Sequence, residues 1–104
     1  MSALNISDSE FDSAVINQKK AAIVFFWATW DGGSKASMPV FEQSANDTSK
    51  LSFYKLDVDS NTGTPTKFGV RNVPTVIVFK DGQANNKLVG SLTRTKLNDL
   101  IDKA

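Results

Sequence analysis

The stretch Phe26-Trp27-Ala28-Thr29-Trp30-Asp31-Gly32-Gly33-Ser34-Lys35 joins two segments of different periodicity. Residues 21–28 are continuously apolar, which predicts a central strand buried on both faces. Beyond the two glycines, apolar residues recur at helical spacing and predict a helix over residues 34–48. A strand, a tight turn and a helix N-terminus bring free backbone N–H groups and the positive end of the helix dipole to one place. We therefore expect the functional site at this turn.

Composition narrows the class of protein. The 104 residues, 40% of them hydrophobic, suit one domain over residues 1–104 with one core. The formal net charge of +1 argues against binding to nucleic acid or to an anionic membrane surface. The longest apolar run is too short to cross a bilayer, and the N-terminus lacks the basic start and long apolar region of a signal peptide. We expect a cytoplasmic protein.

Two residue types are missing from the sequence, and their absence excludes several kinds of catalytic and metal-binding site. The chain has no cysteine and no histidine. Without a thiolate there is no disulfide exchange and no thiolate metal site. Without an imidazole, Ser-His-Asp and Cys-His arrangements are excluded as well. Asp57 and Asp59 are interpreted as loop or capping carboxylates. We therefore expect no catalytic residue, no metal and no cofactor.

The other elements follow from capping, periodicity and turn signals. They predict, in order, a short helix over residues 7–18, a strand over 51–59, a short helix or turn over 61–68, a strand over 76–79, a hairpin turn at Asp81-Gly82, an antiparallel strand over 87–91 and a last helix with an apolar face at 97–101. This alternation of strands and helices predicts an α/β protein with helices on both faces of a sheet.

The central turn resembles the active-site segment of the thioredoxin family, F-W-A-x-W-C-G-P-C-K. Phe26-Trp27-Ala28-x-Trp30 matches it, as do Gly32 and Lys35, and Pro39 follows at the family's spacing. The resemblance covers nearly the whole chain, and residues 10–14 and 53–59 are similar to eukaryotic cytosolic thioredoxins, fungal ones in particular. It implies the thioredoxin fold, which is a central mixed five-stranded sheet flanked by four helices.

The chain departs from the family pattern where the chemistry would occur. Asp31 and Ser34 stand in place of the two cysteines, and Gly33 stands in place of the proline between them. Phe25 occupies the position of a buried aspartate that helps proton transfer in thioredoxins. Lys55, which approaches that aspartate in the family, is then expected to be a solvated strand lysine. As a helix N-cap, Asp31 is better explained by capping than by catalysis.

These changes predict a redox-inactive thioredoxin-like protein that keeps a binding surface for a protein or peptide. The resemblance implies a cis bond before Pro74, and a partner strand that pairs with the backbone of Val73. A homodimer through the same surface is a further possibility for the partner. The residues expected to form this surface are Trp30, Gly32, Gly33, Val73, Pro74, Thr75, Gly90 and Ser91.

Two alternatives remain open from the sequence. The chain is an inactivated or engineered variant of an active protein-disulfide reductase, although simple cysteine replacement does not explain Phe25 and Gly33. Alternatively, it is a glutathione-binding or transferase-like protein that uses the Ser34 hydroxyl, although a transferase of this kind usually needs a second helical domain.

Overall fold

The computed structural model describes residues 3–104. Five strands form one mixed sheet in the spatial order β1-β3-β2-β4-β5. Strands β1, β3 and β2 are parallel, whereas β4 is antiparallel to β2 and β5 is antiparallel to β4. Along the chain the elements are β1 (Leu4–Asn5), η1 (Asp8–Glu10), η2 (Asp12–Ile16), β2 (Ala22–Trp27), α1 (Gly32–Asp47), β3 (Ser52–Asp57), α2 (Gly63–Lys67), β4 (Thr75–Lys80), β5 (Gln83–Val89) and α3 (Arg94–Asp102).

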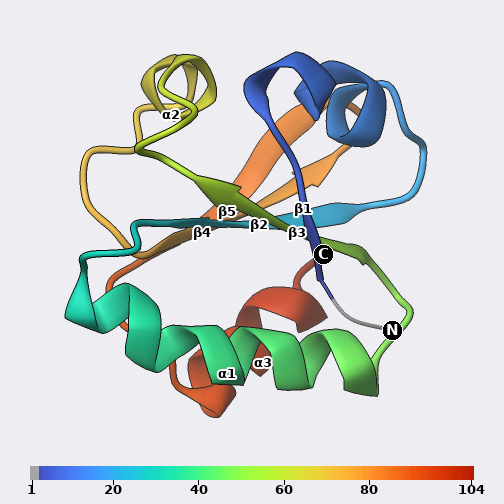
Figure 1. The fold of residues 1–104 in the computed structure, drawn as a ribbon. Helices are drawn as coiled ribbons and strands as arrows, with labels where there is room; N and C mark the ends of the chain where they lie inside the picture. The colour runs from blue at the N-terminus through green and yellow to red at the C-terminus, as the bar shows by residue number, and fades with distance from the viewer. Residues whose placement is uncertain (1–2) are drawn as a thin grey trace.

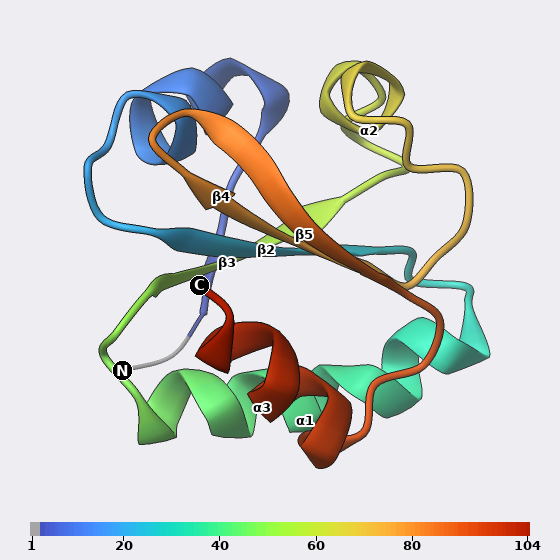
Figure 2. The ribbon, with the colours of Figure 1, turned by 180° about the vertical axis from the view of Figure 1, so that it is seen from behind.

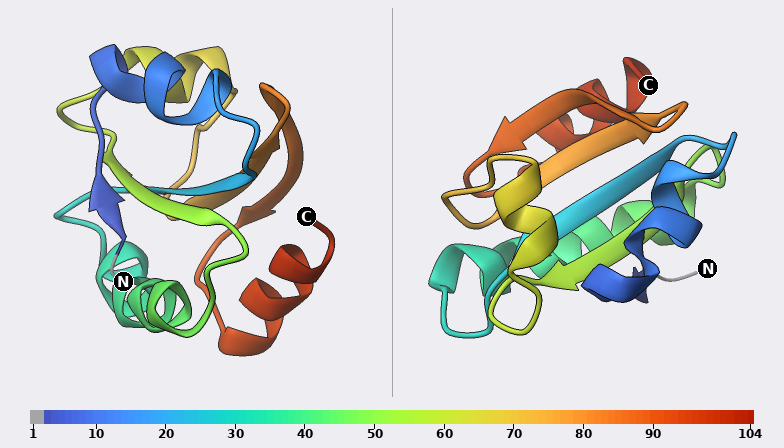
Figure 3. Two further views of the ribbon diagram at one scale, coloured as in Figure 1. Left: turned by 90° about the vertical axis from the view of Figure 1, so that its right-hand side faces the viewer. Right: turned by 90° about the horizontal axis from the view of Figure 1, so that it is seen from above.

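The sheet lies between two layers of helices, as predicted (Figure 1). Helices α1 and α3 cover one face, and η1, η2 and α2 cover the other, an arrangement that is also clear from behind and end-on (Figures 2 and 3). Strand β2 contributes side chains to the core on both faces of the sheet. Ile23 and Phe25 belong to the core under α1 and α3, and Val24 and Phe26 belong to the core on the opposite face. All four side chains are fully buried, as expected of a central strand.

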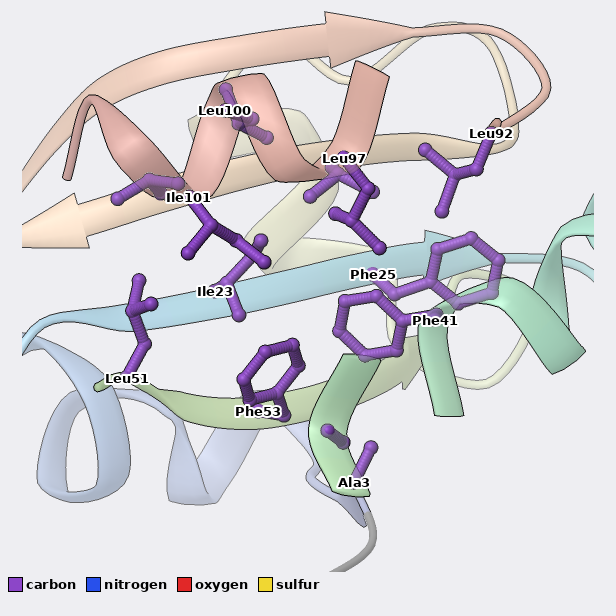
Figure 4. Packing of buried hydrophobic residues seen from close by; sticks show 13 residues of the cluster. Ala3, Ile23, Phe25, Phe41, Leu51, Phe53, Leu92, Leu97, Leu100 and Ile101 are labelled. Atoms are coloured by element: carbon purple, nitrogen blue, oxygen red, sulfur yellow. The ribbon is translucent and has the colours of Figure 1, made fainter. Parts of the chain in front are cut away.

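Phe25 lies at the centre of the core between the sheet and α1. Its ring stacks on Phe41 of α1, with 5.1 Å between ring centroids and an interplanar angle of 19°. Figure 4 shows the two rings side by side, with Phe53 on the other side of Phe41. An offset stack of this kind stabilises the fold beyond the burial of its apolar area. The residue at position 25 therefore has a packing role here.

The environment of Lys55 differs from the prediction. Its ammonium Nζ lies 2.8 Å from Oε2 of Glu42 on α1, and the Lys55 side chain is only 14% exposed. The Glu42 carboxylate also accepts the backbone N–H of Ala3 at 3.0 Å. Burial raises the pKa of Glu42, but the hydrogen bonds from Lys55 and Ala3 outweigh it and leave that pKa below its ordinary value. Lys55 is thus paired rather than solvated, because Glu42 reaches it from α1.

The first helical segment also differs from the prediction of one helix over residues 7–18. It is a 3-10 turn, η1, followed by a π-helical turn, η2, in which the Asn17 N–H donates to the Asp12 carbonyl at 2.8 Å. The Glu10 carboxylate accepts the Ser7 N–H at 3.0 Å, a contact of the kind that a capping box makes at a helix N-terminus. Ser and Asp are frequent in this segment and have low helix propensity, so a regular α-helix is not favoured.

Candidate functional site

The predicted turn connects β2 to α1, and Asp31 is the N-cap of α1. Its carboxylate Oδ2 accepts the Ser34 N–H at 2.7 Å, and its backbone is extended, with φ −87° and ψ 123°. An aspartate at this position satisfies a free N–H and faces the positive end of the helix dipole. Capping therefore explains Asp31, as the sequence predicts.

Ser34 lies below the surface of the turn. Its side chain is fully buried, and its hydroxyl oxygen accepts the backbone N–H of Ala28 at 3.2 Å. A nucleophilic hydroxyl must be accessible to substrate and hydrogen-bonded to a base, and this one meets neither condition. The arrangement counts against the transferase alternative, in which Ser34 would contact glutathione.

The turn meets two other loops at Gly33. A Cβ atom added to Gly33 would lie 3.1 Å from Oγ of Ser91 and 3.3 Å from Cδ of Pro74. The peptide bond between Val73 and Pro74 is cis, and the Pro74 carbonyl accepts the Gly90 N–H at 2.9 Å. Three loops that are far apart in the sequence are thus packed together, and a side chain at position 33 would fit tightly between them.

Beside these loops is a shallow pocket of about 310 Å³, which we call the Trp30 pocket. The Trp30 side chain is 68% exposed, which is unusual for so large an apolar group. The residues that line the pocket are Trp30, Asp31, Val58, Val70, Arg71, Asn72 and Val73. A larger pocket of about 470 Å³ lies at the other end of α1, beside β3, and includes none of the predicted site residues.

The predicted binding residues do not all reach the surface. Trp30, Gly32 and Ser91 are exposed, and Gly33, Val73 and Gly90 are half-buried. Pro74 and Thr75 are buried, and the Thr75 hydroxyl donates to the Asn72 carbonyl at 2.6 Å. Thr75 therefore holds the loop in place rather than offering a side chain to a partner.

Sequence reasoning missed four residues of the pocket lining. They are Val58, Val70, Arg71 and Asn72. Arg71 and Asn72 immediately precede Val73, and this proximity was the available signal. Val58 follows β3, and its N–H donates to the Trp27 carbonyl at 2.9 Å, a contact between strand ends that a linear pattern does not reveal.

Val73 has free backbone groups at the edge of the pocket. Neither its N–H nor its carbonyl takes part in a hydrogen bond with another residue in the range 3–104. A half-buried residue whose backbone N–H and carbonyl have no hydrogen-bond partner can pair with an extended segment of another chain. Such pairing requires no thiol.

Residues 3–104 contain neither a cluster of metal-ligating side chains nor a helix that could span a membrane. Within 3–104, no three Asp, Glu, His or Cys side chains gather in a way that could hold a metal ion. Asp57 instead accepts the Asp59 N–H at 2.9 Å, which stabilises the loop after β3. No helix in this range is both long enough and apolar enough to cross a membrane.

Comparisons with known proteins agree on one family. The sequence model of the thioredoxin family matches residues 2–103. The thioredoxins of Staphylococcus epidermidis and Staphylococcus aureus are each 42% identical to this chain over 104 residues, covering 99% of it and 98% of their own length. The crystal structure of Malassezia sympodialis thioredoxin superimposes with a TM-score of 0.88 at 36% identity, covering 98% of this chain and 90% of that one.

Proposed function

Because this chain belongs to the thioredoxin family but carries no cysteine, we propose that it is a redox-inactive binding protein. Its partner is a protein or peptide that docks at the face formed by Trp30, the Asp31–Ser34 turn, the loop at Val73 and the loop at Gly90-Ser91. We propose a cytoplasmic location for this activity.

Loss of redox activity follows from the chemistry of disulfide exchange. A thiolate must attack one sulfur of the substrate disulfide, and a second thiol must resolve the mixed disulfide that forms. The positions of these thiols hold a carboxylate engaged in capping and a buried hydroxyl, Asp31 and Ser34. Phe25 also stands in place of the buried acid that assists proton transfer in thioredoxins. All of these changes are compatible with a stable fold, because each new side chain has a structural role.

The observation that carries the binding proposal is the juxtaposition of Trp30 with Val73. An indole exposed to 68% lies at the same pocket as a backbone N–H and carbonyl without hydrogen-bond partners among residues 3–104. The indole offers apolar area to a partner side chain, and the Val73 backbone offers two hydrogen bonds to a partner strand. Together they suit an extended peptide that crosses the pocket.

The proposal is tested by panning short random peptides, displayed on phage, against the full chain. Peptides that bind the parent are then measured against Trp30→Ala and, as the matched control, Leu4→Ala. Leu4 is 60% exposed on β1 and lies outside the Trp30 pocket. We expect Trp30→Ala to weaken binding at least about tenfold, the scale of an aromatic anchor, and Leu4→Ala to leave it unchanged. Equal binding to the parent and to Trp30→Ala would refute the docking face.

A further measurement addresses the glutathione alternative. Glutathione is titrated into isotopically labelled protein while the amide resonances of Ser34 and Val73 are followed. The burial of the Ser34 hydroxyl predicts no saturable shift. A saturable shift at both residues would favour that alternative.

A further inference from the structure

We infer that the partner segment carries a carboxylate, from Asp or Glu, beside the apolar side chain that contacts Trp30, and that Arg71 receives it. This inference rests on the proposed function and adds the chemistry of the partner. Arg71 is exposed, lines the Trp30 pocket and is two residues from the free backbone groups of Val73.

Arg71 is the uncompensated charge of the pocket. It forms no ion pair with any residue between 3 and 104, whereas Lys55 and Arg94 have carboxylate partners at 2.8 Å and 2.6 Å. A guanidinium offers several N–H donors in one plane and is suited to bind a carboxylate with two hydrogen bonds. Asn72 adds an amide to the same lining.

The acidic residues near the pocket do not cancel this charge. Asp31 also lines the pocket, but its carboxylate accepts the Ser34 N–H and faces the N-terminus of a helix of 16 residues. The positive end of that helix dipole offsets part of its charge. Asp57 accepts the Asp59 N–H, and neither Asp57 nor Asp59 lines the pocket. Arg71 is thus the one cation in the lining of this pocket, and it has no carboxylate partner among residues 3–104.

The rest of the pocket lining indicates where the acidic residue lies along the partner segment. The apolar residues of the lining are Val58, Val70, Val73 and Trp30, and Arg71 and Asn72 add polar groups to the same pocket. An apolar side chain of the partner fills the pocket, and its neighbour along an extended strand points to the other face, so the charged residue is expected two positions away on the same face. The partner motif is thus an apolar residue and an acidic residue separated by one residue.

The test uses the peptides selected by panning against the full chain. We expect Asp or Glu to be enriched two positions from an apolar residue among the peptides whose binding depends on Trp30. For one such peptide, Glu→Gln in the peptide and Arg71→Gln in the protein should each weaken binding about three- to tenfold. Combining the two changes should cause no further loss. Lys80→Gln removes an equal charge at the far end of β4, outside the pocket, and is the matched control, which should not affect binding.

Three other outcomes would overturn the inference. Trp30-dependent peptides without acidic enrichment, or with no loss on Arg71→Gln, would refute the role of Arg71 and leave the proposed function intact. A parent protein that dimerises through Trp30 would make a second copy the occupant. If panning yields no Trp30-dependent peptide at all, both the proposed function and the inference fail.

Discussion

Replacement of Phe25 by aspartate, Phe25→Asp, places in the core the acid that the resemblance to thioredoxins implies for this position, and we expect a large loss of stability. Phe25 is fully buried and stacked on Phe41. Truncation of a buried phenylalanine costs about 3–5 kcal/mol, and a buried polar group without a partner adds about 1–3 kcal/mol. The sum of about 4–8 kcal/mol approaches the whole stability of a typical domain, about 5–15 kcal/mol.

The charge of the introduced carboxylate gives this loss a defined pH dependence. Lys55 is the register partner of Phe25 on β3, but its ammonium already binds Glu42 at 2.8 Å. Desolvation therefore raises the pKa of the new carboxyl in the folded state above its unfolded value of about 3.9. The folded state then holds the proton more tightly, so the penalty is smallest below about pH 4 and grows as pH rises through the folded pKa.

The assay is urea unfolding followed by circular dichroism, at pH 4 and pH 7, for the parent and three variants. Phe25→Asn has nearly the same shape as Phe25→Asp and no charge, so its difference from the parent should not change with pH. Phe25→Leu keeps an apolar core and should cost only about 1–2 kcal/mol. A Phe25→Asp variant that loses less than about 1 kcal/mol at pH 7, or that has the same penalty at both pH values, would refute the reasoning.

Four further predictions concern contacts that fix the turn and its surroundings. Asp31→Ala removes the N-cap of α1 and should lower the free energy of unfolding by about 1 kcal/mol in urea titrations. Glu42→Gln leaves Lys55 without its carboxylate and should cost about 1–2 kcal/mol, measured the same way. Ser37→Ala removes the buried acceptor of a backbone N–H in the loop after β5 and should cost about 1–3 kcal/mol, with faster amide exchange in that loop. Asp8 caps α2 by accepting the N–H groups of Gly63 and Thr64. Burial raises the pKa of Asp8, but hydrogen bonds from the side chain and backbone of Thr64 and from the backbone of Gly63 outweigh burial and leave this pKa below its ordinary value. The parent should therefore lose more stability than Asp8→Asn when the pH falls through that lowered pKa in an acid titration.

Most of the fold was predictable because local signals and the core pattern agree. The apolar run before the turn is β2, the glycine pair lies at the start of α1, and Asp81 and Gly82 adopt the positive φ values of a tight hairpin turn, 53° and 77°. The patterns did not predict β1, and β5 spans Gln83–Val89 rather than residues 87–91. The largest difference lies in the first helical segment. The short polar residues of this segment have low helix propensity, and the contacts of η2 with the sheet then determine the conformation of its backbone.

The candidate site was only partly predictable, for a physical reason. The turn, Trp30 and Val73 stand out in the sequence because they belong to a recognisable pattern. Burial and long-range partners do not appear in a linear pattern: Thr75 is buried, and Lys55 pairs with Glu42 of α1. Arg71 lies in an unremarkable loop, and only the folded chain places it at the pocket.

The most direct test of the central claim, that the binding face remains while the chemistry is lost, is a protein-disulfide reduction assay with thioredoxin reductase. It compares the parent with the double variant Asp31→Cys, Ser34→Cys. The parent should show no reduction above the uncatalysed rate, and the double variant should reduce the substrate if the docking face that we propose is intact. Reduction by the parent, or a folded double variant that remains inactive, would contradict the claim.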